Sequence, residues 1–172
     1  MKDTGQADGR PEARVADLAA RLTRVEGRLR ELEDERAIRE VLVRYGFAVD
    51  SGDADATAAL YTGDCVIDID AGTNVLHGEE GARGLVDNEV HQAILPRCAH
   101  MIGPLVIRVD QDEAVATGYA CVVVVDDGVP RIWRQGCNRW HLRRTDGGWR
   151  IARRDSAAIG SATAGALLYR GL

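Results

Sequence analysis

The sequence lacks any apolar run near the roughly 20 residues that a membrane-spanning helix needs, so no bilayer-crossing segment is expected. No strongly basic segment is present either. The 22 lysines and arginines stand against 27 aspartates and glutamates, and a formal charge of −5 argues against nucleic acid as the main partner. The first ten residues, MKDTGQADGR, contain no apolar signal core, and we expect residues 1–10 to form a disordered tail.

Paired cysteines are also absent. The four cysteines are widely spaced and form no CxxC pair: Cys65, Cys98, Cys121 and Cys137. A chain of 172 residues with 45% hydrophobic and 28% charged residues can build its own core, so we expect reduced, buried thiols in a soluble, globular, cytoplasmic protein. There is no G-x-S-x-G nucleophile motif, no phosphate-binding loop after a strand and no helical histidine pair, so we expect neither a metal nor a cofactor.

Residues 11–35 carry a heptad pattern typical of a coiled-coil helix. The apolar positions, spaced alternately three and four apart, are Val15, Leu18, Leu22, Val25, Leu29 and Leu32. With the first of these at position a, Arg21 lies at g, five residues before Glu26 at e, and Arg28 and Glu33 repeat this arrangement. Such pairs attract between parallel copies of one chain. The alternative is an amphipathic helix lying on its own domain. Three heptads are marginal alone. We therefore expect the arm to assist a homo-oligomer, a trimer or a dimer, whose main contacts lie on a sheet.

Residues 36–159 are expected to form one compact domain. The heptad phase breaks at residue 36, and a new apolar stripe at helical spacing follows, made of Ile38, Val41, Leu42, Tyr45 and Val49. Ser51-Gly52 ends this helix. After a short second helix the hydrophobic period changes to two, and long strand-like runs follow over residues 100–109, 114–125, 131–143 and 149–158.

The order of the expected elements, with helices first and a run of antiparallel strands after them, predicts an α+β fold. We expect a cone-shaped barrel in which a curved antiparallel sheet wraps around helices, so that the mouth of the cone is a natural ligand cavity. Residues 160–172 are small, apolar and rich in glycine, and they are interpreted as a flexible tail or a lid.

The four histidines differ in their sequence surroundings. We interpret His77 as a turn residue, His91 as a residue at a helix C-terminus and His141 as a strand residue. His100 differs because it opens an apolar strand, RCAHMIGPLVIRV, where burial disfavours the charged ring unless an anion lies near. Asp50, at the end of the apolar helix, is a candidate for that anion. A carboxylate there would orient the imidazole and keep it basic, as a general base near neutral pH requires. A satisfied core histidine is the alternative.

Three segments in order resemble a known family: RAIREVLVRYGFAVDSGDADATAALYTGDCVIDID, AHMIGPLVIRV and NRWHLRRTDGGWRIARRD. Over roughly residues 34–159 they are similar to the SnoaL-like branch of the nuclear transport factor 2-like superfamily. Within it, the motifs resemble those of scytalone dehydratases and hexachlorocyclohexane dehydrochlorinases. The resemblance implies that His100 is a base held by Asp50. It also implies a functional arginine at Arg154 and a pocket asparagine at Asn138.

The same resemblance implies a function. We expect a cofactor-independent lyase or isomerase in which proton abstraction from a small, cyclic, largely apolar metabolite leads to elimination. Residues expected to contact the substrate are Tyr45, Met101, Val123, Trp133 and Asn138, although strand parity leaves open which side chains face inward. Two alternatives stay open: a polyketide cyclase or epoxide-opening hydrolase, and a non-catalytic small-molecule binding protein. For Arg154 the alternative is a surface arginine.

Overall fold

A computed structural model describes residues 11–169 of the chain. The expected disordered tail (1–10) and the last three residues lie outside the described residues. The chain divides into two units, Met1–Asp34 and Glu35–Leu172, and each is described by itself. The helices are α1 (Pro11–Asp50), α2 (Ala54–Ala59), α3 (Gly78–Asp87), α4 (Glu89–Gln92) and α5 (Ala164–Tyr169). The strands are β1 (Tyr61–Ile69), β2 (Asn74–His77), β3 (Cys98–Asp110), β4 (Glu113–Asp126), β5 (Val129–Thr145) and β6 (Gly148–Ala158).

The described part of the first unit is the N-terminal portion of α1. Its heptad positions are all exposed, from 53% for Leu29 to 66% for Val15. The prediction that the helix continues through the phase break is confirmed, because α1 runs without interruption to Asp50. No helix in residues 11–169 combines the length and the apolar character that crossing a membrane demands.

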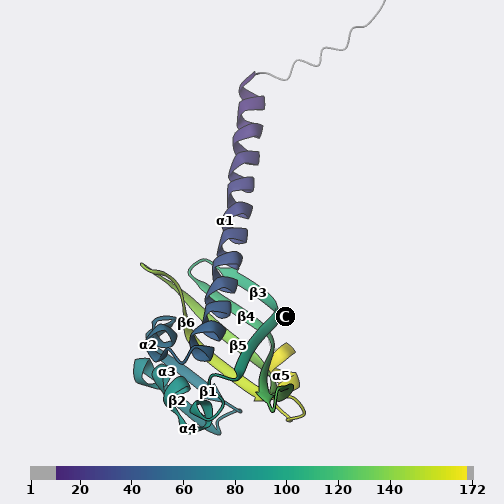
Figure 1. Cartoon of the computed structure of the whole chain (residues 1–172). Helices are drawn as coiled ribbons and strands as arrows, with labels where there is room; N and C mark the ends of the chain where they lie inside the picture. Colours follow the sequence, from purple (N-terminus) through teal and green to yellow (C-terminus); the bar gives the residue numbers. More distant parts are fainter. Residues whose placement is uncertain (1–10, 170–172) are drawn as a thin grey trace, which may run out of the picture. The chain divides into compact units, whose positions relative to one another are not determined.

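The second unit is an α+β domain built on one six-stranded sheet, with the order β2-β1-β6-β5-β4-β3 (Figure 1). The strands from β3 to β6 form the antiparallel run that the sequence predicts. One pairing differs from the expected antiparallel sheet, because β1 and β6 are parallel. These two strands are far apart in the sequence, so no hairpin turn dictates their relative direction.

The core lies between the C-terminal part of α1 and the inner face of the sheet. The predicted stripe of Ile38, Leu42, Tyr45 and Val49 is buried, and it belongs to one apolar cluster with Trp140, Leu142 and Ile151 of β5 and β6. A helix stripe and a sheet face each bury only one side, so packing them together removes both from water. Figure 1 shows α2, α3 and α4 gathered beside β1 and β2, away from α5.

Helix α5 lies in the segment that we expected to be a flexible tail or a lid. Ala164 is buried together with Cys137 of β5 and Ala157 of β6, and Leu167 and Leu168 pack against this group. The described part of the C-terminal segment is therefore attached to the sheet through its apolar residues.

Candidate active site

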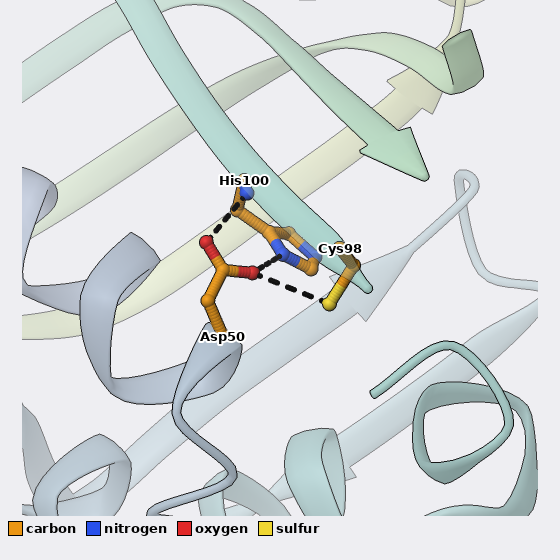
Figure 2. Close-up of side chains that lie close together, drawn as sticks. All are labelled: Asp50, Cys98 and His100. Atoms are coloured by element: carbon orange, nitrogen blue, oxygen red, sulfur yellow. Dashed lines mark hydrogen bonds and ion pairs between the residues drawn. The ribbon is translucent and has the colours of Figure 1, made fainter. Parts of the chain in front are cut away.

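Asp50 is the last residue of α1, and its carboxylate reaches β3. Gly52, with φ of +73°, turns the chain directly after the helix, as the Ser51-Gly52 pair predicts. Oδ2 of Asp50 accepts the backbone N–H of His100 at 2.7 Å, and Oδ1 lies 2.6 Å from Nδ1 of the same residue (Figure 2). The expected proximity of carboxylate and imidazole is thus present, and only the tertiary fold brings these two residues together.

Both side chains are largely shielded, with 21% of Asp50 and 17% of His100 exposed. Burial alone would raise the pKa of the Asp50 carboxyl, but hydrogen bonds from the ring and backbone of His100 outweigh it and lower the pKa below 3.8. Because an ionised carboxylate can only accept hydrogen bonds, Nδ1 of His100 carries the proton. In the neutral form of this ring the lone pair lies on Nε2, which is what a proton-abstracting imidazole needs.

Cys98 is a third member of this cluster. It lies two residues before His100 on the same face of β3, and its Sγ donates to Oδ1 of Asp50 at 3.5 Å (Figure 2). Burial first, and then the neighbouring Asp50 carboxylate, raise the pKa of the Cys98 thiol to about 11. The thiol is therefore a neutral donor at neutral pH. The sequence predicts only a buried thiol at Cys98, although the spacing of two from His100 already places both residues on one face of a strand.

His100 lines a cavity of about 80 Å³ in the second unit. Of the residues expected around the substrate, Tyr45, Met101, Trp133 and Asn138 also line it, as does Arg154. Larger surface hollows of about 770 and 520 Å³ lie elsewhere in the unit, but neither includes Asp50 or His100 in its walls. We place the candidate active site at the smaller cavity because Arg154 and His100 line it, and His100 is hydrogen-bonded to Asp50.

Val123, which we also expected as a cavity wall, does not line the cavity, and Val122 does. The difference follows from the pairing of β4 with β3. Val122 pairs with His100 of β3 and shares its face of the sheet. The pairing of β4 with β5 shifts between Val122 and Val123. The sequence pattern of four consecutive valines could not reveal which of them faces inward.

Arg154 reaches the cavity from β6. Its Nη1 donates to the hydroxyl of Tyr45 at 2.5 Å, its Nε donates to Oδ1 of Asn138 at 3.1 Å, and its guanidinium lies 5.2 Å from the centre of the Tyr45 ring. Burial opposes the charge, but Tyr45 and Tyr61 outweigh it and raise the pKa of Arg154, which stays a cation. It is partly buried and so is not the surface arginine of the alternative interpretation.

An ion pair that the sequence did not predict also borders the cavity. Arg134 of β5 lines it and pairs with Asp70, in the turn after β1. The backbone N–H of Ala71 donates to the carbonyl of Ser156, another lining residue, at 3.1 Å. The turn between β1 and β2 is therefore held against the wall of the cavity.

His91 is the second histidine near the site. It is 7% exposed, its Nε2 donates to the backbone carbonyl of Val49 at 2.8 Å, and its ring centre lies 5.4 Å from that of His100. The expectation of a helix-end position is met by α4. Its burial was not predicted, because the surrounding residues Asp87, Asn88 and Glu89 suggested a solvated end. His91 supports the end of α1 one residue before Asp50.

Within the described part of the chain, the ligand atoms of Asp50, Cys98 and His100 lie within 4.8 Å of one another. This group is therefore the candidate for holding a metal ion. Their present arrangement favours protons over a metal ion. Oδ1 and Nδ1 are at hydrogen-bond distance, and a metal would have to separate them and ionise the Cys98 thiol.

The fold and this site define a class: an α+β cone domain with an aspartate–histidine pair at its internal cavity. The model of the SnoaL-like domain matches residues 30–155, so this chain belongs to the SnoaL-like family, as its motifs predicted. No curated protein sequence matches the chain.

Solved structures agree with this assignment. An NTF2-like protein with a cystatin-like fold from Novosphingobium aromaticivorans is 40% identical, with a TM-score of 0.80 over 86% of this chain and 96% of that one. A candidate aromatic ring hydroxylase from the same organism is 26% identical, with a TM-score of 0.61 over 76% and 92%. A candidate scytalone dehydratase, also from that organism, is 19% identical with a TM-score of 0.64 over 77% and 97%, and this likeness supports the fold alone.

Proposed function

We propose that this protein is a cofactor-independent lyase or isomerase that abstracts a proton from carbon in a small cyclic metabolite. The observation that carries the proposal is the 2.6 Å contact between Oδ1 of Asp50 and Nδ1 of His100, at a cavity that the partly buried cation Arg154 also lines. Membership of the SnoaL-like family supports small-molecule chemistry without selecting the reaction, because this fold hosts many activities.

In the proposed reaction, Nε2 of His100 takes the proton from a carbon adjacent to a carbonyl or to a carbon bearing a leaving group. The electron pair of that C–H bond forms the new double bond. In elimination the leaving group departs with the electrons of its own bond. In isomerisation the imidazolium returns the proton to another carbon. Asp50 stabilises the imidazolium formed in between, so it raises the proton affinity of the base without itself being protonated.

Negative charge develops on the substrate as the proton leaves. Arg154 and Asn138 are the polar groups available to stabilise it, since both line the cavity and are bonded to each other. Donors that are already positioned lower the barrier because they need little reorganisation during the reaction. The walls formed by Met101 and Trp133 suit an apolar ring.

Proton exchange tests this proposal without knowledge of the natural substrate. Cyclopentanone, cyclohexanone and their β-hydroxy and β-chloro derivatives, incubated with the protein in D₂O, should exchange or eliminate their α-protons, as followed by NMR. The rate should fall by about 10²- to 10⁴-fold in His100→Ala. A His141→Ala variant, which removes an imidazole that does not line the cavity, is the control.

Three results would redirect the proposal. Ring closure or epoxide opening that survives His100→Ala would favour the cyclase or hydrolase alternative. Ligand binding that is equal in wild type and His100→Ala, without exchange on any compound, would favour a binding protein. Exchange that is equally fast in wild type and His100→Ala would remove His100 as the base.

A further inference from the structure

Arg154 is a cation inside the cavity without an anion of its own. Among the described residues it makes no ion pair with a carboxylate. Its hydrogen-bond acceptors are the Tyr45 hydroxyl and the Asn138 amide, and the Tyr61 hydroxyl also interacts with it. The neighbouring carboxylate in the chain, Asp155, is engaged by Arg153, whose Nη2 lies 2.5 Å from it. A partly buried cation whose hydrogen-bond partners carry no formal negative charge is stabilised further when an anion binds next to it.

The guanidinium also has unused donors. Of its five N–H groups, one on Nε donates to Asn138 and one on Nη1 donates to Tyr45, and the interaction with the Tyr61 hydroxyl uses at most one more. Arg154 lines the cavity, so a ligand bound there would lie beside the remaining N–H groups. A planar carboxylate is the group that pairs with two neighbouring N–H donors of arginine.

We infer that the substrate of this site is a small organic carboxylate, whose carboxylate group supplies the counter-ion that Arg154 lacks. This inference rests on the proposed function. It narrows the proposed substrates from small metabolites in general to those that carry a carboxylate group. The carboxylate pairs with Arg154 in the ground state, and it directs the C–H bond of the substrate toward His100. The cavity of about 80 Å³ suits an anion of this small size.

Sodium acetate and acetamide test this inference, because they share size and shape and differ in charge. Both are titrated at constant ionic strength, with the side-chain NMR signals of Arg154 Nε–H and Asn138 as reporters. Acetate should bind wild type about ten-fold or more tightly than acetamide, as a charge-assisted bidentate pair implies. Arg154→Met should abolish the preference. Arg153→Met is the matched control, since this neighbouring arginine lies outside the cavity and should leave the preference intact.

The outcomes separate this inference from the proposed function. Equal affinity of wild type for the two probes overturns it, and that result does not depend on the folding of any variant. Loss of the preference in Arg134→Met but not in Arg154→Met overturns the assignment to Arg154. His100→Ala should keep the preference for acetate while losing proton exchange. If wild type exchanges protons but does not prefer acetate to acetamide, only the inference of a carboxylate substrate is contradicted. If wild type prefers acetate but exchanges no protons, only the proposed proton abstraction is contradicted.

A separate observation concerns the helical arm. All six heptad positions in its described residues are apolar and exposed, and they repeat at intervals of three and four. The flanking charges specify a partner. In a parallel pair, Arg21 faces Glu26 of the other copy and Arg28 faces Glu33, so both contacts are attractive. In an antiparallel pair like positions meet, which places arginine against arginine and glutamate against glutamate.

We also propose that the arm forms a parallel coiled coil with further copies of this chain. The self-complementary charges identify the occupant of the apolar face as a second copy, in register. A coil of three heptads is weak alone, so the arm strengthens an association that also uses other contacts. The exposed apolar residues Val106, Tyr119 and Ile132 of the sheet are where such contacts, expected from the sequence, would form.

Sedimentation equilibrium of the full chain tests the arm. Leu22→Glu, at an a position, should raise the concentration needed for assembly by about ten-fold or more, whereas Ala20→Glu at the outer f position should not. Orientation is tested with Leu18→Cys, which oxidation should cross-link only in a parallel, in-register coil; wild type, with its four native cysteines, is the control. The proposal is overturned if wild type sediments as a monomer, or if Leu22→Glu and Ala20→Glu change the assembly equally. It is also overturned if Leu18→Cys forms no cross-link.

Discussion

A Cβ atom on Gly46 would lie 2.7 Å from the carbonyl oxygen of His100. Real Cβ atoms essentially never approach another atom this closely, so the absence of a side chain at this position is what lets α1 lie directly against β3. Asp50 follows one helical turn after Gly46 and so inherits this short separation. The close approach of helix and strand is therefore the structural cause of the hydrogen bonds between Asp50 and His100.

Replacing Gly46 by alanine should separate helix and strand. We expect Gly46→Ala to lose about 1–3 kcal/mol of stability through overpacking against backbone, and to slow proton exchange by at least about ten-fold because Asp50 moves. Denaturant unfolding and the exchange assay measure the two effects. Gly27→Ala in the same helix is the control: nothing lies within 4 Å of its Cβ, so it should stabilise the helix by up to about 1 kcal/mol. Equal behaviour of the two variants would disprove this account.

Asp50→Asn should retain the fold and lose the base. An amide NH₂ facing Nδ1 of His100 would donate rather than accept, which favours the tautomer with its proton on Nε2. That tautomer has no lone pair directed at the substrate, and we expect exchange to fall by about 10²- to 10⁴-fold. Ring nitrogen chemical shifts of His100 report the tautomer directly. An unchanged tautomer together with unchanged exchange would remove the orienting role of Asp50.

The stability contributed by Asp50 should depend on pH in one direction. Its pKa in the folded protein lies below the ordinary value of 3.8, so the folded state binds its proton less readily than the unfolded chain does. The stabilisation is then fully present above about pH 4 and is lost as the pH falls through the folded pKa. Unfolding free energies of wild type and Asp50→Asn should converge below that point. Gly27→Ala is the control because it leaves Asp50 and His100 intact. The difference in unfolding free energy between wild type and this variant should not change with pH.

Cys98 should react slowly with iodoacetamide at pH 8, because burial and the Asp50 carboxylate hold its pKa near 11. Removing that charge in Asp50→Asn should increase the alkylation rate several-fold, measured by peptide mass spectrometry. Cys137 is the internal control. Burial raises the pKa of this thiol without a contribution from Asp50, so its rate should not change. An unaltered rate at Cys98 would show that the Asp50 charge does not act on the thiol.

Several parts of the site could be predicted from sequence and others could not. Asp50 and His100 were found because each combines a rare or charged side chain with an apolar segment, and because their motifs resemble a family. Gly46 gave no signal, since glycine in a helix predicts only a local cost. Arg134 and Asp70 pair across strands that the sequence does not place together. Val122 lines the cavity and Val123 does not, because cross-strand pairing with His100, which no local pattern shows, selects between them.

Hydrophobic periodicity in the sequence determined the elements of this protein: the heptads of the arm, the stripe from Ile38 to Val49 and the strands after it. Those signals are local, because each side chain repeats with the period of its own helix or strand. The tertiary structure decided which groups face one another. The distance from Asp50 to His100, the missing anion at Arg154 and the neutral thiol of Cys98 all depend on how elements far apart in the sequence pack. Packing of a helix against a strand is set by complementary surfaces, and no single segment encodes it.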